Sequence, residues 1–163
     1  MRKLTFAVTV FSLLIMAGCF VNFETKDPNI NMGLAIDREK AFEFSNKLIE
    51  EVLAEKNQEV YGKMSDVFRK TYSIDEIPKS IEKMSSHFGK LNETKYKTEE
   101  IGYWMFQDGT KKPMRKFFYS TKTDKAEMGK YFLQVSVIAE GENLKCASFS
   151  MLEFPGELPK NLK

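Results

Sequence analysis

The period of the apolar residues changes near residue 91, and this change constrains the fold more than any other feature of the chain. Before that point apolar residues recur at intervals of three and four, as in an amphipathic helix, and after it they alternate, as in a half-buried strand. Helices followed by strands indicate the α+β class, in which helices pack on one face of an antiparallel sheet. The sequence therefore predicts three N-terminal helices packed on a four-stranded antiparallel sheet.

The first two helices are predicted from their apolar faces. The first begins after Asp37, a favourable N-cap residue, and runs to Lys56. The second spans residues 60–68, with Gly62 as its weak point because glycine is a poor helix former.

The third helix has mixed signals at its start. Ser73 and Glu76 have the spacing of a capping box, but Pro78 fits better near the first helical position after a short turn. Gly89 is the expected C-terminal residue. The predicted buried face consists of Ile77, Ile81, Met84 and Phe88.

Four strands follow, separated by turn residues. Asp108 and Gly109 mark the first turn, residues 140–143 form the last, and Pro155 ends the final strand. The predicted strands are residues 94–106, 114–123, 130–139 and 144–154.

The first eighteen residues have the composition of an export signal. Arg2 and Lys3 precede an apolar stretch, residues 4–17, that is shorter than the roughly 20 residues of a membrane-spanning helix. Met16-Ala17-Gly18-Cys19 resembles the lipobox of bacterial lipoproteins, in which the cysteine is modified. This resemblance implies cleavage of a signal peptide (1–18) and attachment of diacylglycerol and a further acyl chain, such as palmitate, to Cys19. Plain secretion is the alternative.

The rest of the chain divides into three parts. Residues 19–36 contain Pro28, Gly33 and several Asn, and are expected to be a flexible tether from the membrane. Residues 37–156 form one α+β domain, and residues 157–163 are a polar tail. Loss of Arg2 and Lys3 leaves 23 basic residues against 23 acidic ones, so the mature charge gives no reason to expect a nucleic-acid partner.

In this order of elements the chain resembles the NTF2-like and cystatin-like α+β superfamily, and most closely its small bacterial lipoproteins. The resemblance covers about residues 38–154 and rests on the element order, on the texture of residues 57–73 (NQEVYGKMSDVFRKTYS) and on Phe88-Gly89-Lys90 before the sheet. It implies a curved sheet under the helices. Members of this superfamily include enzymes, ligand binders and assembly modules, so the fold does not choose among them.

Catalytic and cofactor motifs are missing from the sequence. His87 is the single histidine and is expected on the surface at a helix end, so neither a metal site nor a His-based triad is predicted. No nucleotide-binding glycine motif occurs, and no cofactor is expected. Cys146 is expected to be a small buried residue.

An enzyme in this superfamily would place an acid and a tyrosine in the space between sheet and helices. The candidates for that role are Glu99, Glu100, Tyr103, Tyr119 and Tyr131. The simpler interpretation is that the two glutamates lie on a solvated strand and that the tyrosines belong to a half-buried sheet.

Aromatic residues on the strands suggest a cavity wall or a docking surface. The candidates are Tyr103, Trp104, Phe117, Tyr119 and Tyr131, near the basic residues Lys111, Lys112, Arg115 and Lys116. The expected function is a non-catalytic binding or assembly module on the cell envelope, anchored to the membrane through Cys19, with an envelope protein or a small apolar ligand as partner. The alternative is a carrier of a small apolar ligand, or an isomerase- or dehydratase-like enzyme. The expected location is the outer membrane of a Gram-negative cell, or otherwise the outer face of the cytoplasmic membrane.

Overall fold

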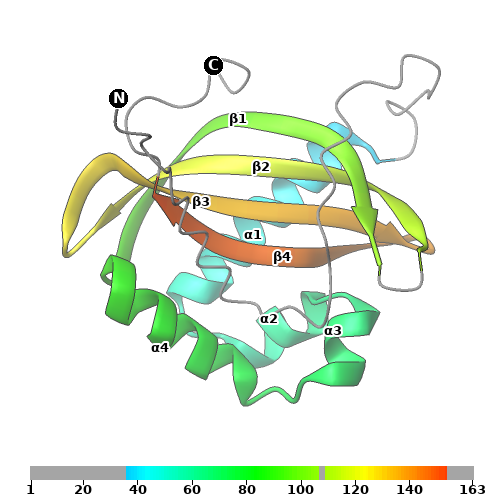
Figure 1. The fold of residues 1–163 in the computed structure, drawn as a ribbon, viewed down its shortest axis with the longest axis horizontal. Coiled ribbons are helices and arrows are strands. Elements are labelled where there is room, and N and C mark those ends of the chain that lie inside the picture. The colour runs from blue at the N-terminus through cyan, green and yellow to red at the C-terminus, as the bar shows by residue number, and fades with distance from the viewer. Residues whose placement is uncertain (1–35, 107–108, 154–163) are drawn as a thin grey trace, which may run out of the picture.

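The computed structural model describes residues 36–106 and 109–153, in which helices come first and strands follow (Figure 1). The predicted signal peptide, Cys19, residues 20–35 of the predicted tether, Asp108, Pro155 and the polar tail lie outside these ranges. The elements are α1 (Arg38–Leu53), α2 (Asn57–Lys63), α3 (Asp66–Thr71), α4 (Glu76–Phe88), β1 (Leu91–Met105), β2 (Lys111–Thr123), β3 (Ala126–Glu140) and β4 (Asn143–Glu153).

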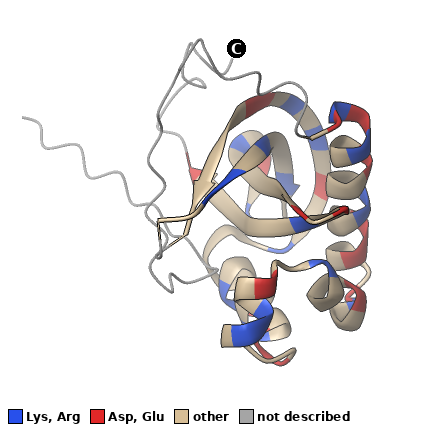
Figure 2. Ribbon diagram, turned by 90° about the vertical axis from the view of Figure 1, so that its right-hand side faces the viewer, with Lys and Arg blue, Asp and Glu red and all other residues tan. Residues whose placement is uncertain are grey.

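The strands form one antiparallel sheet in the order β1-β2-β3-β4, each paired with the next along the chain. The predicted α+β class with a four-stranded antiparallel sheet is therefore confirmed. The third strand begins four residues earlier than predicted, because the turn before it is confined to Asp124 and Lys125, and the second strand begins at Lys111 instead of Met114. The sheet curves around the helices, and register shifts such as those at Tyr96/Thr98 and Ser136/Val137 contribute to the bend (Figure 2).

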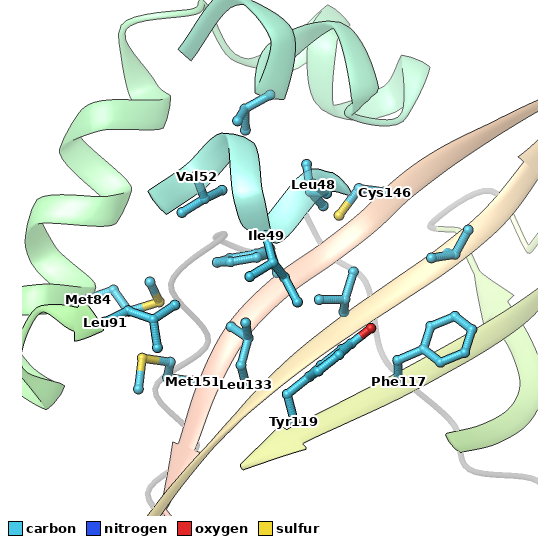
Figure 3. Close-up of a cluster of buried hydrophobic side chains, with 14 of the residues drawn as sticks. Leu48, Ile49, Val52, Met84, Leu91, Phe117, Tyr119, Leu133, Cys146 and Met151 are labelled. Carbon is cyan, nitrogen blue, oxygen red and sulfur yellow. The ribbon is translucent and has the colours of Figure 1, made fainter. Parts of the chain in front are cut away.

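The main core lies between the helices and the inner face of the sheet. The first helix, α1, crosses β2, β3 and β4, while α2 and α4 pack along β4 (Figure 1). Ile49 of α1 points toward Leu133 of β3, and Leu48 lies beside Cys146 of β4 (Figure 3). Burial of these apolar side chains is the principal source of stability in this layer.

A second, smaller cluster lies on the opposite, outer face of the sheet. It consists of Trp104, Phe106, Met114 and Ile138, with Ala147 packed against them, and we call it the outer cluster. The sheet therefore carries buried apolar residues on both of its faces.

The first helix begins and ends close to where the sequence predicted. Asp37 is the N-cap, and its side chain accepts a hydrogen bond from the backbone N–H of Lys40 at 2.8 Å. This bond satisfies one of the backbone donors that every helix start leaves open.

The predicted second helix is wrong in its extent, because the chain breaks at Met64 and Ser65 into α2 and α3. The backbone N–H of Ser65 donates to the carbonyl of Cys146 in β4 at 2.9 Å, which draws the chain out of the helix. The Ser65 hydroxyl then accepts a hydrogen bond from the N–H of Phe68 and caps α3. The helix count in the described ranges is consequently four instead of three.

The last helix agrees with the prediction at both ends. It starts at Glu76, so Pro78 lies in the first turn, where its missing N–H breaks no helical bond. Ser73 contributes its backbone carbonyl to a turn and does not act as a side-chain cap. Gly89 ends the helix with φ 90°, and a β-carbon there would overlap the side chains of Asp124 and Thr123.

Gly89→Ala should lower the free energy of unfolding by about 1–3 kcal/mol, because its backbone conformation is one that residues with a β-carbon rarely adopt. Gly62→Ala is the matched control. Gly62 lies in α2, and a β-carbon there meets nothing within 4 Å. The control should leave stability unchanged or raise it by up to about 1 kcal/mol. Urea unfolding measures both, and equal effects would contradict the Gly89 geometry.

Candidate functional site

Two arginines converge on one carboxylate where the chain enters the domain. Arg38 Nε donates to Oε1 of Glu99 at 2.9 Å, and Arg115 Nη1 donates to the same oxygen at 3.3 Å. Arg115 Nε also donates to the carbonyl of Ile36 at 2.9 Å. We call Arg38, Glu99 and Arg115 the Arg–Glu–Arg cluster. It joins the start of α1 to β1 and β2.

Aromatic and polar side chains extend this cluster along α1. Arg38 Nη2 donates to the hydroxyl of Tyr96 at 3.4 Å, and the Phe42 ring packs edge-on against Tyr96 with centroids 5.0 Å apart. The Tyr119 hydroxyl donates to Oδ1 of Asn46 at 2.9 Å and shares a second hydrogen bond, also 2.9 Å, with Ser45. Burial raises the pKa of Tyr119 to about 12, so the phenol stays protonated at neutral pH.

These contacts act as a clamp, by which we mean that they hold α1 against the sheet. One oxygen of Glu99 receives both guanidinium groups, and Tyr119 is committed to two side chains of α1. The other oxygen, Oε2, is buried and has no hydrogen-bond partner among the described residues. The acid and the phenol that a proton-transfer mechanism would need thus hold α1 against the sheet.

A small apolar cavity lies between α2, α4 and β4. Its walls include Met64, Met84 and Phe149, and the space open to a water-sized sphere is about 20 Å³. That is room for about one water molecule. The cavity is far below the 300–1,000 Å³ typical of a site that encloses a small organic ligand.

The structure divides the five predicted cavity or docking residues between two faces. Phe117, Tyr119 and Tyr131 are buried together in the main core beneath the helices. Trp104 lies in the outer cluster, on the other face. Tyr103 precedes it on β1 and is half-buried opposite Pro113. Three of the five are therefore brought together, as core residues, and two are not.

The basic residues of the first hairpin are also separated. Arg115 is buried on the inner face and Lys116 on the outer face, where its ammonium group lies 3.7 Å from Oε2 of Glu100. Lys112 pairs with Glu140 at 3.0 Å. Along the ribbon of α1, acidic and basic residues are intermixed (Figure 2). The four hairpin residues thus do not form one exposed basic surface.

The two other residues considered in the sequence, His87 and Cys146, have surroundings typical of structural residues. His87 is exposed in the last turn of α4 and contacts the Phe88 ring, as predicted for a helix-end histidine. Cys146 is fully buried in β4, and burial raises the pKa of its thiol to about 12. Within residues 36–106 and 109–153 no three His, Cys, Asp or Glu side chains could hold a metal ion. No helix in that part of the chain is long and apolar enough to cross a membrane.

Sequence reasoning did not identify Arg38, Ser45 or Arg115 as members of the site. A signal for Arg115 was present, because alternation along β2 places it on the same face as Phe117 and Tyr119. An arginine on an otherwise apolar face needs a carboxylate partner. Glu99 shares this face on the neighbouring strand.

Glu99→Gln should lower the free energy of unfolding by about 3 kcal/mol, because it leaves the buried Arg115 guanidinium without a compensating charge. The matched control is Glu76→Gln, which removes an exposed ion pair with Lys79. This control should cost less than about 1 kcal/mol. Thermal and urea unfolding measure both variants, and a Glu99 effect no larger than the control would show that the cluster is not a clamp.

Comparison of the chain with protein-family models, with curated proteins and with solved structures gave no match.

Proposed function

We propose that this chain is a lipoprotein of the bacterial cell envelope, whose folded domain is a non-catalytic module that binds another envelope protein. The domain would belong to the NTF2-like and cystatin-like group, on the strength of its element order and curved antiparallel sheet. The membrane is reached through lipid on Cys19, at the outer membrane of a Gram-negative cell or otherwise on the outer face of the cytoplasmic membrane.

The anchor is supported by residues 1–19. Leu13, Leu14 and Ile15 precede Met16-Ala17-Gly18-Cys19, in which two small residues, Ala17 and Gly18, stand directly before the cysteine. Two or three acyl chains anchor a protein stably, whereas one chain binds only marginally.

The space between α1 and the sheet is filled by side chains, and this favours a protein partner over a small ligand. Phe117, Leu133 and Val135 on the inner face are fully buried against the helices, and Tyr119 is bonded to α1. A domain whose interior is occupied by its own side chains recognises partners with its surface. A macromolecule uses such a surface better than a small molecule, which needs a concave site.

The second candidate function is an enzyme or a carrier of a small apolar ligand in the same fold. One observation favours it: Glu99 Oε2 is a buried acceptor without a described partner, on the face that also carries Tyr96 and Tyr119. Against it stands the pairing of Glu99 with two guanidinium groups.

Cys19→Ala should abolish incorporation of a labelled fatty acid into the chain and leave the uncleaved precursor, because the acceptor thiol is lost. Cys146→Ala is the matched control, since that thiol is sealed in β4 and has no lipobox before it. The control should label as the wild type does. Acyl labelling of the Cys19 variant would rule out the anchor.

Native mass spectrometry of the mature chain, extracted from its own cell in mild detergent, distinguishes the two functions. The native mass should equal that of the denatured lipidated chain, or that of this chain plus a second polypeptide. A small molecule present in the native spectrum and absent from the denatured one would contradict the proposal and favour a carrier or an enzyme.

A further inference from the structure

The two edges of the sheet have different surroundings. The edge of β4 meets the chain between α2 and α3, where Met64 forms a bridge with Cys146 and Ser65 donates to the Cys146 carbonyl at 2.9 Å. The edge of β1 forms a rim of the sheet (Figure 1) and pairs with no described strand other than β2. Residues 98–105 make no backbone hydrogen bond to any other described segment. Such an edge offers a row of backbone donors and acceptors to another chain.

The first half of the β1 edge is protected against pairing, and the second half is not. Before Thr98 the ladder with β2 is interrupted by two register shifts, and the exposed Lys95 and Lys97 lie there. Bulges and lysines are devices that keep an edge strand from joining another chain. From Thr98 to Met105 the ladder is regular, and residues 101–105 (IGYWM) carry no charge.

The pairing with β2 shows which backbone groups of this second half point outward. Hydrogen-bonded and non-hydrogen-bonded pairs alternate along an antiparallel ladder. Phe106 donates its N–H to the carbonyl of Thr110 at 2.9 Å, and Tyr103 lies opposite Pro113, which has no N–H to donate. Residues 100, 102, 104 and 106 therefore bond toward β2. The outward N–H and C=O groups belong to Glu99, Ile101, Tyr103 and Met105.

We propose that this part of the β1 edge binds a second copy of the chain, and that the two β1 strands pair antiparallel about a two-fold axis at Gly102. In this register Ile101 lies opposite Tyr103 of the partner, and Glu99 lies opposite Met105 of the partner. Every outward N–H and C=O of the segment then meets one from the other protomer. The two sheets become one continuous sheet, with the helices of both protomers on the same side.

The side chains of this segment fit a copy of themselves. Ile101 is 45 % exposed and is the most exposed large apolar side chain among the described residues. It shares the inner face with Tyr103, because their partners on β2 are Arg115 and Pro113. A β-branched residue opposite an aromatic one is a favourable cross-strand pair. Gly102 lies on the axis, where the two backbones approach most closely, and a glycine suits such a close approach.

The charges on the outer face are complementary in this register. Glu100 lies opposite Trp104 of the partner, and the neighbour of Trp104 on β2 is Lys112. Two strand spacings, about 10 Å, separate the backbones of these oppositely charged residues. That is about the distance over which charges interact at 0.1 M salt. The two-fold axis repeats the arrangement, so the acidic end of each segment faces the basic end of the other.

Other positions of the axis use the edge less fully. An axis at Glu100 would set two carboxylates directly opposite each other, which is unfavourable. An axis at Ile101 would bring Met105 to the register shift in the first half of the partner's strand. An axis at Tyr103 would carry Glu99 past the last residue of the partner's β1. The axis at Gly102 is the position that pairs all four outward residues within regular strand.

The inference depends neither on lipid at Cys19 nor on the envelope protein proposed above. A second polypeptide of the chain's own mass would support the dimer, whereas one of a different mass would bear on the proposed function alone.

A cysteine on the axis tests the register. Gly102→Cys is accommodated, because the nearest atom to a β-carbon there belongs to Met114, at 3.8 Å. In the proposed pairing the two cysteines have Cα atoms about 4.5 Å apart, within the range of a disulfide. Tyr103→Cys is the matched control, because its two copies lie about 8 Å apart, beyond that range.

The mature chain carrying each change is purified in mild detergent, oxidised gently and run on a non-reducing gel. Gly102→Cys should give a disulfide-linked dimer, and Tyr103→Cys should give at least several-fold less. Both variants retain Cys19 and Cys146, so linkage through those residues would be equal in the two.

Proline distinguishes strand pairing from other contacts. In the Gly102→Cys chain, Tyr103→Pro removes an outward N–H and no bond to β2, so it should abolish cross-linking. Tyr103→Val loses the same ring but keeps the N–H, and should cross-link as the Gly102→Cys chain does. Circular dichroism shows whether each variant keeps its sheet, and Ile101→Pro replaces Tyr103→Pro if that variant unfolds.

Three results would overturn the proposal. The first is a folded Gly102→Cys chain that gives no linked dimer. The second is equal cross-linking of Gly102→Cys and Tyr103→Cys, which would indicate random collision or another register. The third is cross-linking that persists in a folded proline variant, which would show that the β1 edge does not form the contact.

Discussion

The buried guanidinium of Arg115 is the interaction on which the arrangement of this domain depends. It donates to the carbonyl of Ile36 and to the carboxylate of Glu99 on β1, while the backbone of Arg115 belongs to β2. A charge in that position is costly unless it is paired and hydrogen-bonded, and both conditions hold. The cluster thereby fixes where α1 starts relative to the sheet, and Tyr119 fixes the middle of the helix through Ser45 and Asn46. The orientation of α1 thus rests on directional bonds as well as on apolar packing.

The opposite edge of the sheet is held in a different way. Ser65 donates its backbone N–H to Cys146 of β4, and its hydroxyl begins α3. One residue therefore ends one helix segment, binds the edge strand and starts the next segment. The end of α4 is also bonded to the sheet. The Thr123 hydroxyl of β2 donates to the carbonyl of Phe88, the last residue of α4 before Gly89.

Most of the fold could be predicted because the apolar period reports the type of element directly. The caps at Asp37 and Gly89 were predictable because they depend on the residue type at the helix end, which is also a local property. The break at Ser65 was not, since a tertiary bond to Cys146 decides it and no local period records that bond. The candidate site was predictable only in its residue types. Alternation shows that Trp104 and Phe117 each face a side of the sheet, but it does not show which side receives the helices. An aromatic strand residue consequently looks the same in sequence whether it lines a cavity or fills a core.

The seclusion of Cys146 has a consequence for chemistry in an oxidising compartment. A thiol whose pKa is raised to about 12 by burial forms little thiolate, and thiolate is the form that reacts with oxidants and disulfides. In the proposed mature protein the other cysteine carries lipid, so neither cysteine readily supplies a thiolate for disulfide exchange. A molecule that escaped acylation would lack the membrane anchor, and it would also carry Cys19 as a free thiol able to join two copies through a disulfide.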